Sequence, residues 1–294
     1  SSNRAFLVKP FLNSSRLYPS EILGYMYLSS QHLTEILFNS LSLYLCLRVI
    51  RASILSSVTS IYIETPIPNS IVLPKGITTI GDDAFSYNTS LTSIKIPNTV
   101  TSIGKRAFQG CTNLTSIEIP DTVTYIGDYC FSGCNRLQKI KLSKKIQTIN
   151  QRLLQGCSSL TEIEIPEGVK SIGYAAFISC NKLTTITLPA SLTSFNGTAI
   201  AGLSRLTEVK VADGNNSFKF ENGILLSKDG KTMYMALLTL TEINVPNGVV
   251  SIVGDTLSGS SATKIILPDT VSSNLSGTVF NVMNKLTKIE LSST

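Results

Sequence analysis

Short segments in which apolar and polar residues alternate return at a fixed interval along the chain. One of them is Leu114-Thr115-Ser116-Ile117-Glu118-Ile119. Such alternation predicts a short strand with one buried and one exposed face. Its apolar positions recur every 23 residues in three series: Leu91, Leu114, Leu137, Leu160, Leu183 and Leu206; Ile94, Ile117, Ile140, Ile163, Ile186 and Val209; Ile96, Ile119, Leu142, Ile165, Leu188 and Val211. Six copies in register indicate a repeat architecture.

A second pattern follows each predicted strand. Because proline lacks a backbone donor, it ends the strand in four of the copies, at Pro97, Pro120, Pro166 and Pro189. Val123 and Ile126 then turn another apolar edge inward, and Gly127 permits a bend that a side chain would resist. Residues 128–133 are expected to form a single short helical turn that directs Phe131 into the core. Twenty-three residues are thus enough for one coil of strand, turn, helical turn and return.

One such unit cannot cover its own apolar edge, but stacked units share a continuous core. Each strand is reached after one full coil, so the strands are expected to be parallel, and the usual crossover chirality predicts a right-handed coil. Further copies of the pattern precede and follow the six, at residues 71–85, 243–252, 265–271 and 286–291. The predicted fold is therefore an α/β right-handed solenoid of 23-residue units with parallel strands and short helical turns.

The units "LTSIEIPDTVTYIGDYCFSGCNR" and "LTEIEIPEGVKSIGYAAFISCNK" resemble the BspA-like class of leucine-rich repeats, with its IP-x-x-V-x-x-IG-x-x-AF-x-GC core. The resemblance covers residues 67–294. The segment "NNSFKFENGILLSKDGKTMYMAL" resembles the hairpin that such proteins insert between repeats, which places an insertion near residues 213–238. Asp229-Gly230 is by itself a two-residue turn signal. The departures are Leu154 in place of Phe, and Asn150 and Asn196 in place of Gly.

The resemblance implies a cell-surface or secreted protein of bacteria or protists, in many cases an adhesin for host matrix proteins or other cells. The leading hypothesis is accordingly a non-enzymatic protein-protein interaction module that is extracellular or at the cell surface. The alternative is a structural spacer that displays another domain of a longer surface protein. The competing class is an enzyme, with its chemistry in residues 1–66.

Residues 1–66 fit the repeat poorly. "LTEILF" from Leu33 and "VTSIYI" from Val58 resemble strand starts, which favours degenerate repeats. A cap over the apolar end of the stack is the alternative, and a third possibility is that much of this segment is not autonomous structure. Its most apolar run, 41–50, is ten residues long and is interrupted by Arg48, whereas a membrane-spanning helix needs about 20. We therefore expect no transmembrane segment here.

Composition and charge narrow the class of partner. The 294 residues carry 25 Lys and Arg against 19 Asp and Glu, a net charge of +6. The basic residues are mixed with acidic ones along the chain, unlike those of nucleic-acid domains, which gather on one face, so no nucleic-acid partner is expected. An apolar fraction of 43% is sufficient for a core and argues against disorder. There is no Trp, which leaves few large anchors for binding.

Candidate chemistry is sparse. The single histidine, His32, is too little for a zinc site, and no cofactor or metal motif occurs. Cysteines fall at one repeat position, in Cys111, Cys134, Cys157 and Cys180, so they would stack as a ladder. Neighbouring coils lie about 5 Å apart, within reach of a disulfide, yet small thiols also pack well, and free buried thiols are favoured. Cys130 is expected in the core, and Cys46 has no assignable partner.

The outward-facing strand residues are the candidate partner-binding site. We call them the charged strip: Lys95, Glu118, Lys139, Lys141, Glu162, Glu164, Glu208 and Lys210. Parallel pairing is expected to set Lys95, Glu118, Lys141 and Glu164 side by side with alternating sign. Two interpretations stay open: an ion-pair ladder that keeps an exposed sheet in solution, or a recognition surface for an extracellular matrix or cell-surface protein. Tyr129 and Tyr174, after the repeat glycine, are rival contact points on an edge of the solenoid.

Overall fold

The computed structural model describes residues 70–294 apart from residues 75, 272–274, 276–277 and 293–294. All of these residues belong to one unit, Leu41–Thr294. The predictions for residues 1–66, whether cap or degenerate repeats, lie outside the described residues, as do His32 and Cys46.

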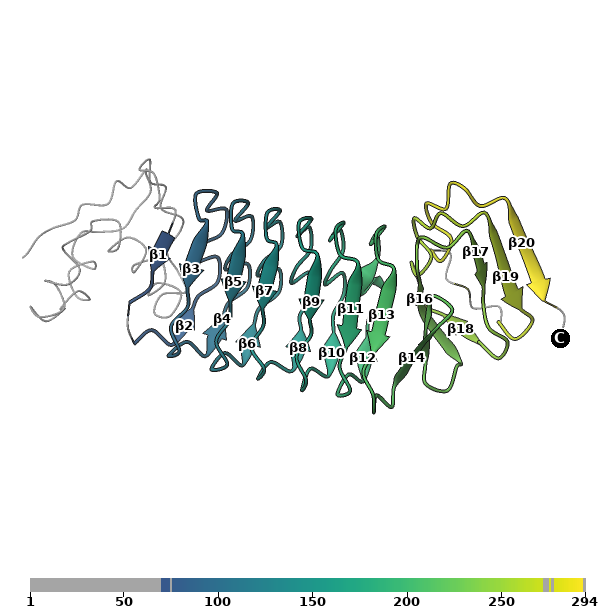
Figure 1. The fold of residues 1–294 in the computed structure, drawn as a ribbon, viewed down its shortest axis with the longest axis horizontal. Coiled ribbons are helices and arrows are strands. Elements are labelled where there is room, and N and C mark those ends of the chain that lie inside the picture. The colour runs from purple at the N-terminus through teal and green to yellow at the C-terminus, as the bar shows by residue number, and fades with distance from the viewer. Residues whose placement is uncertain (1–69, 75, 272–274, 276–277, 293–294) are drawn as a thin grey trace, which may run out of the picture. The chain divides into compact units, whose positions relative to one another are not determined.

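One column of parallel strands forms from the alternating segments (Figure 1). It contains β1 (Ser70–Val72), β3 (Ser93–Lys95), β5 (Ser116–Glu118), β7 (Lys139–Lys141), β9 (Glu162–Glu164), β11 (Thr185–Leu188) and β13 (Glu208–Val211). In every strand from β1 to β9 a buried isoleucine lies between two exposed residues. Partners are 23 residues apart, as in Ile117 opposite Ile140. The predicted parallel solenoid of 23-residue coils is confirmed.

A second column of two-residue strands forms where the chain turns back toward the core. Its members are β2 (Thr79–Ile80), β4 (Ser102–Ile103), β6 (Tyr125–Ile126), β8 (Thr148–Ile149), β10 (Ser171–Ile172) and β12 (Ser194–Phe195). Each buries its second residue and turns the first toward solvent, and neighbours pair in parallel at the same 23-residue step. Each coil is therefore fixed to the next at two places.

The α/β class and the short helical turns are not confirmed. Among the described residues the helical element is one 3₁₀ turn, η1 (Gly197–Ile200). In the other coils alternate backbone N–H groups donate to the next coil: those of Asp83 and Phe85, for example, donate to the carbonyls of Lys105 and Ala107. Asp83 also adopts the left-handed region, with φ 57°. A helix needs each N–H for its own turn, so these inter-coil bonds prevent one from forming.

The interior repeats as faithfully as the sequence. Phe108 stacks between Phe85 and Phe131, with centroid separations of 5.2 and 5.4 Å. Leu154, the departure from the pattern, occupies the next position and is fully buried, so it fills the core without extending the ring stack. The shared core then continues through Phe177 and the later coils to the hairpin.

Three antiparallel strands interrupt the repeat: β14 (Phe218–Glu221), β15 (Ile224–Ser227) and β16 (Thr232–Ala236). The turn at Asp229-Gly230 joins β15 to β16, and Asp229 accepts hydrogen bonds from Ser227 and from the Lys231 amide. Leu225 packs into the preceding core, whereas Ile224 and Leu226 pack into the following one. The inserted strands thus separate two hydrophobic cores and are buried on both faces.

The coils resume after the insertion. They contain β17 (Glu242–Asn244), β18 (Ser251–Ile252), β19 (Lys264–Pro268) and β20 (Lys288–Ser292). β16 pairs in parallel with β18, and β17, β19 and β20 form a second parallel sheet. The copies that the sequence shows in eroded form are therefore still built as coils.

Candidate protein-binding surface

The charged strip lies on the outer face of the longer strands. All eight of its side chains are exposed, and each is adjacent to a buried isoleucine or valine of the same strand. The strand register places Glu118 opposite Lys141, and both Glu164 and Lys210 opposite Thr187 of β11. The alternation of the sequence thus exposes these residues, and the 23-residue step aligns them.

The alternating ion-pair ladder forms in one place. Glu118 and Lys141 approach to 2.5 Å, and this hydrogen bond, followed by the charge of Glu118, raises the pKa of Lys141. Lys210 pairs with Glu208 of its own strand at 3.5 Å. In the described part of the chain, the other strip residues form no ion pair: Lys95, Lys139, Glu162 and Glu164. Half of the strip therefore keeps its charge available to a partner.

A groove of about 800 Å³ lies over β3, β5 and the end of β7. It spans the point at which the hydrogen-bond ladder is interrupted, because β1 pairs with β3 and β5 with β7, but β3 and β5 belong to separate sheets. Three strip residues line it, Lys95, Glu118 and Lys141. The groove gives this end of the strip a concave surface that an extended segment could enter.

Three further polar residues line the same groove and were not singled out from the sequence: Asn98, Asp121 and Lys145. They come from the turns that follow β3, β5 and β7. Asp121 is held in place because one of its carboxylate oxygens accepts a hydrogen bond from the Lys144 amide in the next coil, at 2.9 Å. A signal was available, since all three lie two or four residues beyond the last inward-facing residue of a strand, at polar positions.

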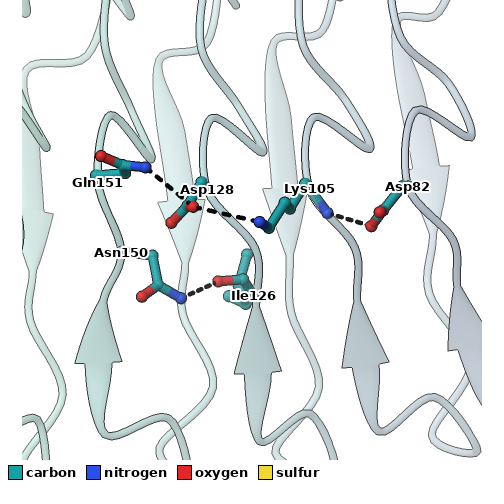
Figure 2. Close-up of polar contacts among 6 residues, drawn as sticks. All are labelled: Asp82, Lys105, Ile126, Asp128, Asn150 and Gln151. Carbon is teal, nitrogen blue, oxygen red and sulfur yellow. Dashed lines mark hydrogen bonds and ion pairs between the residues drawn. The ribbon is translucent and has the colours of Figure 1, made fainter.

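A chain of polar contacts crosses the coils along the turn edge, the residues that follow each short strand (Figure 2). The Lys105 amide donates to Asp82 at 2.7 Å, the Lys105 ammonium lies 3.9 Å from Asp128, and Gln151 donates to the same carboxylate at 3.1 Å. Beside this chain, Arg106 donates two hydrogen bonds to Asp83, at 2.9 and 3.0 Å. These carboxylates are thus neutralised by neighbouring coils.

The repeat glycine is required on this edge by close packing between coils. A Cβ on Gly127 would lie 2.5 Å from the Lys105 nitrogen, so no side chain fits there. Asn150 occupies the same repeat position one coil later, and its amide donates to the Ile126 carbonyl at 2.6 Å (Figure 2). At the next coil, a Cβ on Gly173 would find its nearest neighbour at 3.0 Å. Backbone bending, the role expected of Gly127, is not the reason, since its φ is not positive.

The rival tyrosines also lie on the turn edge. Tyr174 is 45% exposed and Tyr129 is half-buried. The two rings flank the guanidinium of Arg152, whose central carbon is 5.4 Å from each ring centroid. Sequence reasoning identified the tyrosines but missed the arginine between them.

The cysteine ladder is buried and reduced, as expected. Cys111, Cys134, Cys157 and Cys180 are free and fully buried, as is Cys130. Each ladder thiol donates to a carbonyl 26 residues earlier, as Cys134 does to Phe108 at 3.2 Å. Burial raises the pKa of Cys111 and of Cys180 to about 12. A nucleophilic cysteine needs the opposite shift, so these thiols fill the core.

Two other kinds of site were searched for among the described residues. No group of three or more His, Cys, Asp or Glu side chains in this part of the chain could hold a metal ion. None of the described helical segments is long and apolar enough to cross a membrane.

A family model described as a BspA type leucine-rich repeat region matches the chain in six copies, over residues 59–177, 102–222 and 230–294. The chain belongs to this family. The BspA-type repeat therefore accounts for the 23-residue step and for the two strand columns. No curated protein matches the chain.

Solved structures share the BspA-type fold. The pneumococcal vaccine antigen PcpA matches 76% of this chain with 23% identity and a TM-score of 0.55. A leucine-rich repeat protein from Eubacterium ventriosum matches the same share, with 20% identity and a TM-score of 0.49. The matched regions cover 51% and 60% of those two chains, so this chain spans about half to three fifths of their length.

Proposed function

We propose that the chain is a non-enzymatic protein-protein interaction module of a cell-surface or secreted protein. It acts as an adhesin that binds host matrix or cell-surface proteins through the charged strip. The observation that carries this proposal is the groove over β3, β5 and β7, into which Lys95, Glu118 and Lys141 project. Solenoids commonly bind partners on the surface formed by one strand column.

The distribution of charge favours a protein partner. The groove combines three lysines, Lys95, Lys141 and Lys145, with the carboxylates of Glu118 and Asp121. A polyanion would be repelled by the carboxylates, whereas a protein surface can present charges of both signs. Such complementarity contributes to specificity and to the rate of association.

The strip carries no aromatic residue, and tyrosine, tryptophan and arginine dominate strong interfaces. Binding by one chain is therefore expected to be of modest affinity and to depend on salt, because exposed charges are screened.

A structural spacer is the second candidate, and one contact favours it. The Glu118–Lys141 pair neutralises two charges at the centre of the strip, as expected of a surface whose role is to stay hydrated. In that case another domain of a longer protein would carry the binding activity.

The test is a binding screen of the full 294-residue chain against immobilised matrix and cell-surface proteins, at low and high salt. Binding to one of them that weakens at high salt would support the adhesin. No binding across the panel, with the chain shown to be folded by circular dichroism, would favour the spacer.

A further inference from the structure

Arg152 on the turn edge has an arrangement that the charged strip lacks. Tyr129 comes from the preceding coil and Tyr174 from the following one, and both rings lie 5.4 Å from the guanidinium carbon. The Arg152 amide also donates to the Tyr174 carbonyl at 2.9 Å, which holds the two coils together beside the ring. The guanidinium is therefore fixed in orientation.

The polar groups of this guanidinium are incompletely used. Its Nε atom is shielded from solvent and has no hydrogen-bond partner among the described residues. With the faces covered by rings, the in-plane N–H groups remain for a ligand. An arginine fixed in this way presents a planar fork that matches the two oxygens of a carboxylate.

The charge of Arg152 is also uncompensated. In the described part of the chain, no acidic side chain forms an ion pair with it. Asp128, in the preceding coil, is held by Lys105 and Gln151. The contrast with Arg106 on the same edge is direct, because Asp83 already accepts two hydrogen bonds from that guanidinium.

We propose that the Tyr129–Arg152–Tyr174 cluster binds a carboxylate side chain, glutamate or aspartate, of a partner protein. Tyrosine and arginine are the side chains that most often dominate protein interfaces. Because the guanidinium is already oriented, little side-chain freedom is lost on binding. This site lies on the turn edge and does not depend on whether the charged strip binds a partner.

The surroundings favour a single carboxylate over a sulfated polysaccharide. A polyanion needs several free cations in a row, but the nearest ones along the edge, Lys105 and Arg106, are paired with carboxylates. The acidic groups of Asp82 and Asp83 further along the same edge would repel a second sulfate.

The test follows the Arg152 Nε–H resonance by NMR in the full chain. The probe is a blocked Ala-Glu-Ala tripeptide, and its Ala-Gln-Ala twin is the control. We expect a saturable shift with the glutamate peptide and none with the glutamine peptide. No shift with either peptide would overturn the proposal. Tighter binding of a heparin-type oligosaccharide at the same resonance would overturn the assignment to a protein carboxylate.

Variants separate the fork from its charge. Arg152→Lys keeps the charge but loses the planar fork, so peptide binding, followed at the Tyr174 amide, should weaken. Tyr174→Leu removes one exposed ring and frees the guanidinium, and we expect binding about two- to tenfold weaker, the entropy of one released side chain. Arg106→Lys is the matched control and should leave binding unchanged. Equal binding by wild type and Arg152→Lys would contradict the proposal.

Discussion

Inward-facing and outward-facing residues of the same strands differ sharply from coil to coil. The inward column of β3, β5, β7 and β9 is isoleucine throughout, and it is buried. The outward neighbours change from Lys95 to Glu118, Lys141 and Glu164. Stacking requires each coil to present the same shape to the next, whereas solvent tolerates any polar side chain. The repeated column therefore encodes the fold, and the variable one is where a function can be encoded.

The largest effect is expected from placing a charge in the inward column. Ile117 is 5% exposed, so Ile117→Asp would bury a carboxylate without a partner, at a cost of more than about 3 kcal/mol of unfolding free energy. Chemical denaturation should show the loss. Ser116→Asp, one residue away on the exposed face, is the control and should unfold like the wild type. Equal stability of the two variants would contradict the register.

A smaller loss is expected where the coils approach most closely. In Gly127→Ala the new Cβ would meet the Lys105 nitrogen at 2.5 Å, and forcing the coils apart should cost about 1–3 kcal/mol. Gly173→Ala is matched to it but has its nearest contact at 3.0 Å, so it should cost less. Melting temperatures would rank the two, and the reverse order would exclude coil spacing as the cause.

The buried thiols make stability depend on pH in the alkaline range. Burial raises the pKa of Cys111 and of Cys180 from 9.0 to about 12. Unfolded thiols therefore ionise before folded ones, and their contribution to stability is complete below about pH 9 and is lost as pH rises toward 12. We expect denaturation midpoints to fall over this range. A Cys111→Ala, Cys180→Ala variant should lose less, and an identical slope would show that other groups are responsible.

The smallest effect on stability is expected in the outward column. Glu118→Lys removes an exposed ion pair with Lys141, and such pairs contribute little to folding. Glu221→Lys is a matched control, because Glu221 pairs with Lys219 on β14, outside the strip. Both variants should melt close to the wild type. A large destabilisation by Glu118→Lys alone would assign the strip a structural role.

The sequence is most informative where a residue type repeats in register. The leucine and isoleucine columns located the strands of the coils, and the shared position of four cysteines indicated their burial. The short helical turns were expected because residues 128–133 have the length of one turn, but length says nothing about where the N–H groups donate. That choice depends on the neighbouring coil, which a single repeat does not contain.

The surface was less predictable for the same reason. Alternation indicated that Lys95 and Glu118 are exposed, but not that the ladder is interrupted between their strands and a groove lies there. Arg152 went unnoticed because its two rings come from different columns of the repeat: Tyr129 precedes it by 23 residues and Tyr174 follows it by 22. A diagonal contact of this kind emerges only when the coils are placed side by side.

The most direct test of the central claim compares Glu118→Lys with Glu221→Lys in binding to a protein captured by the screen. Each variant reverses one exposed carboxylate and breaks one ion pair, so the two differ in location and not in charge. The account predicts altered affinity for Glu118→Lys and wild-type affinity for Glu221→Lys. Equal affinities in both variants would contradict it and leave the strip as a hydrated surface.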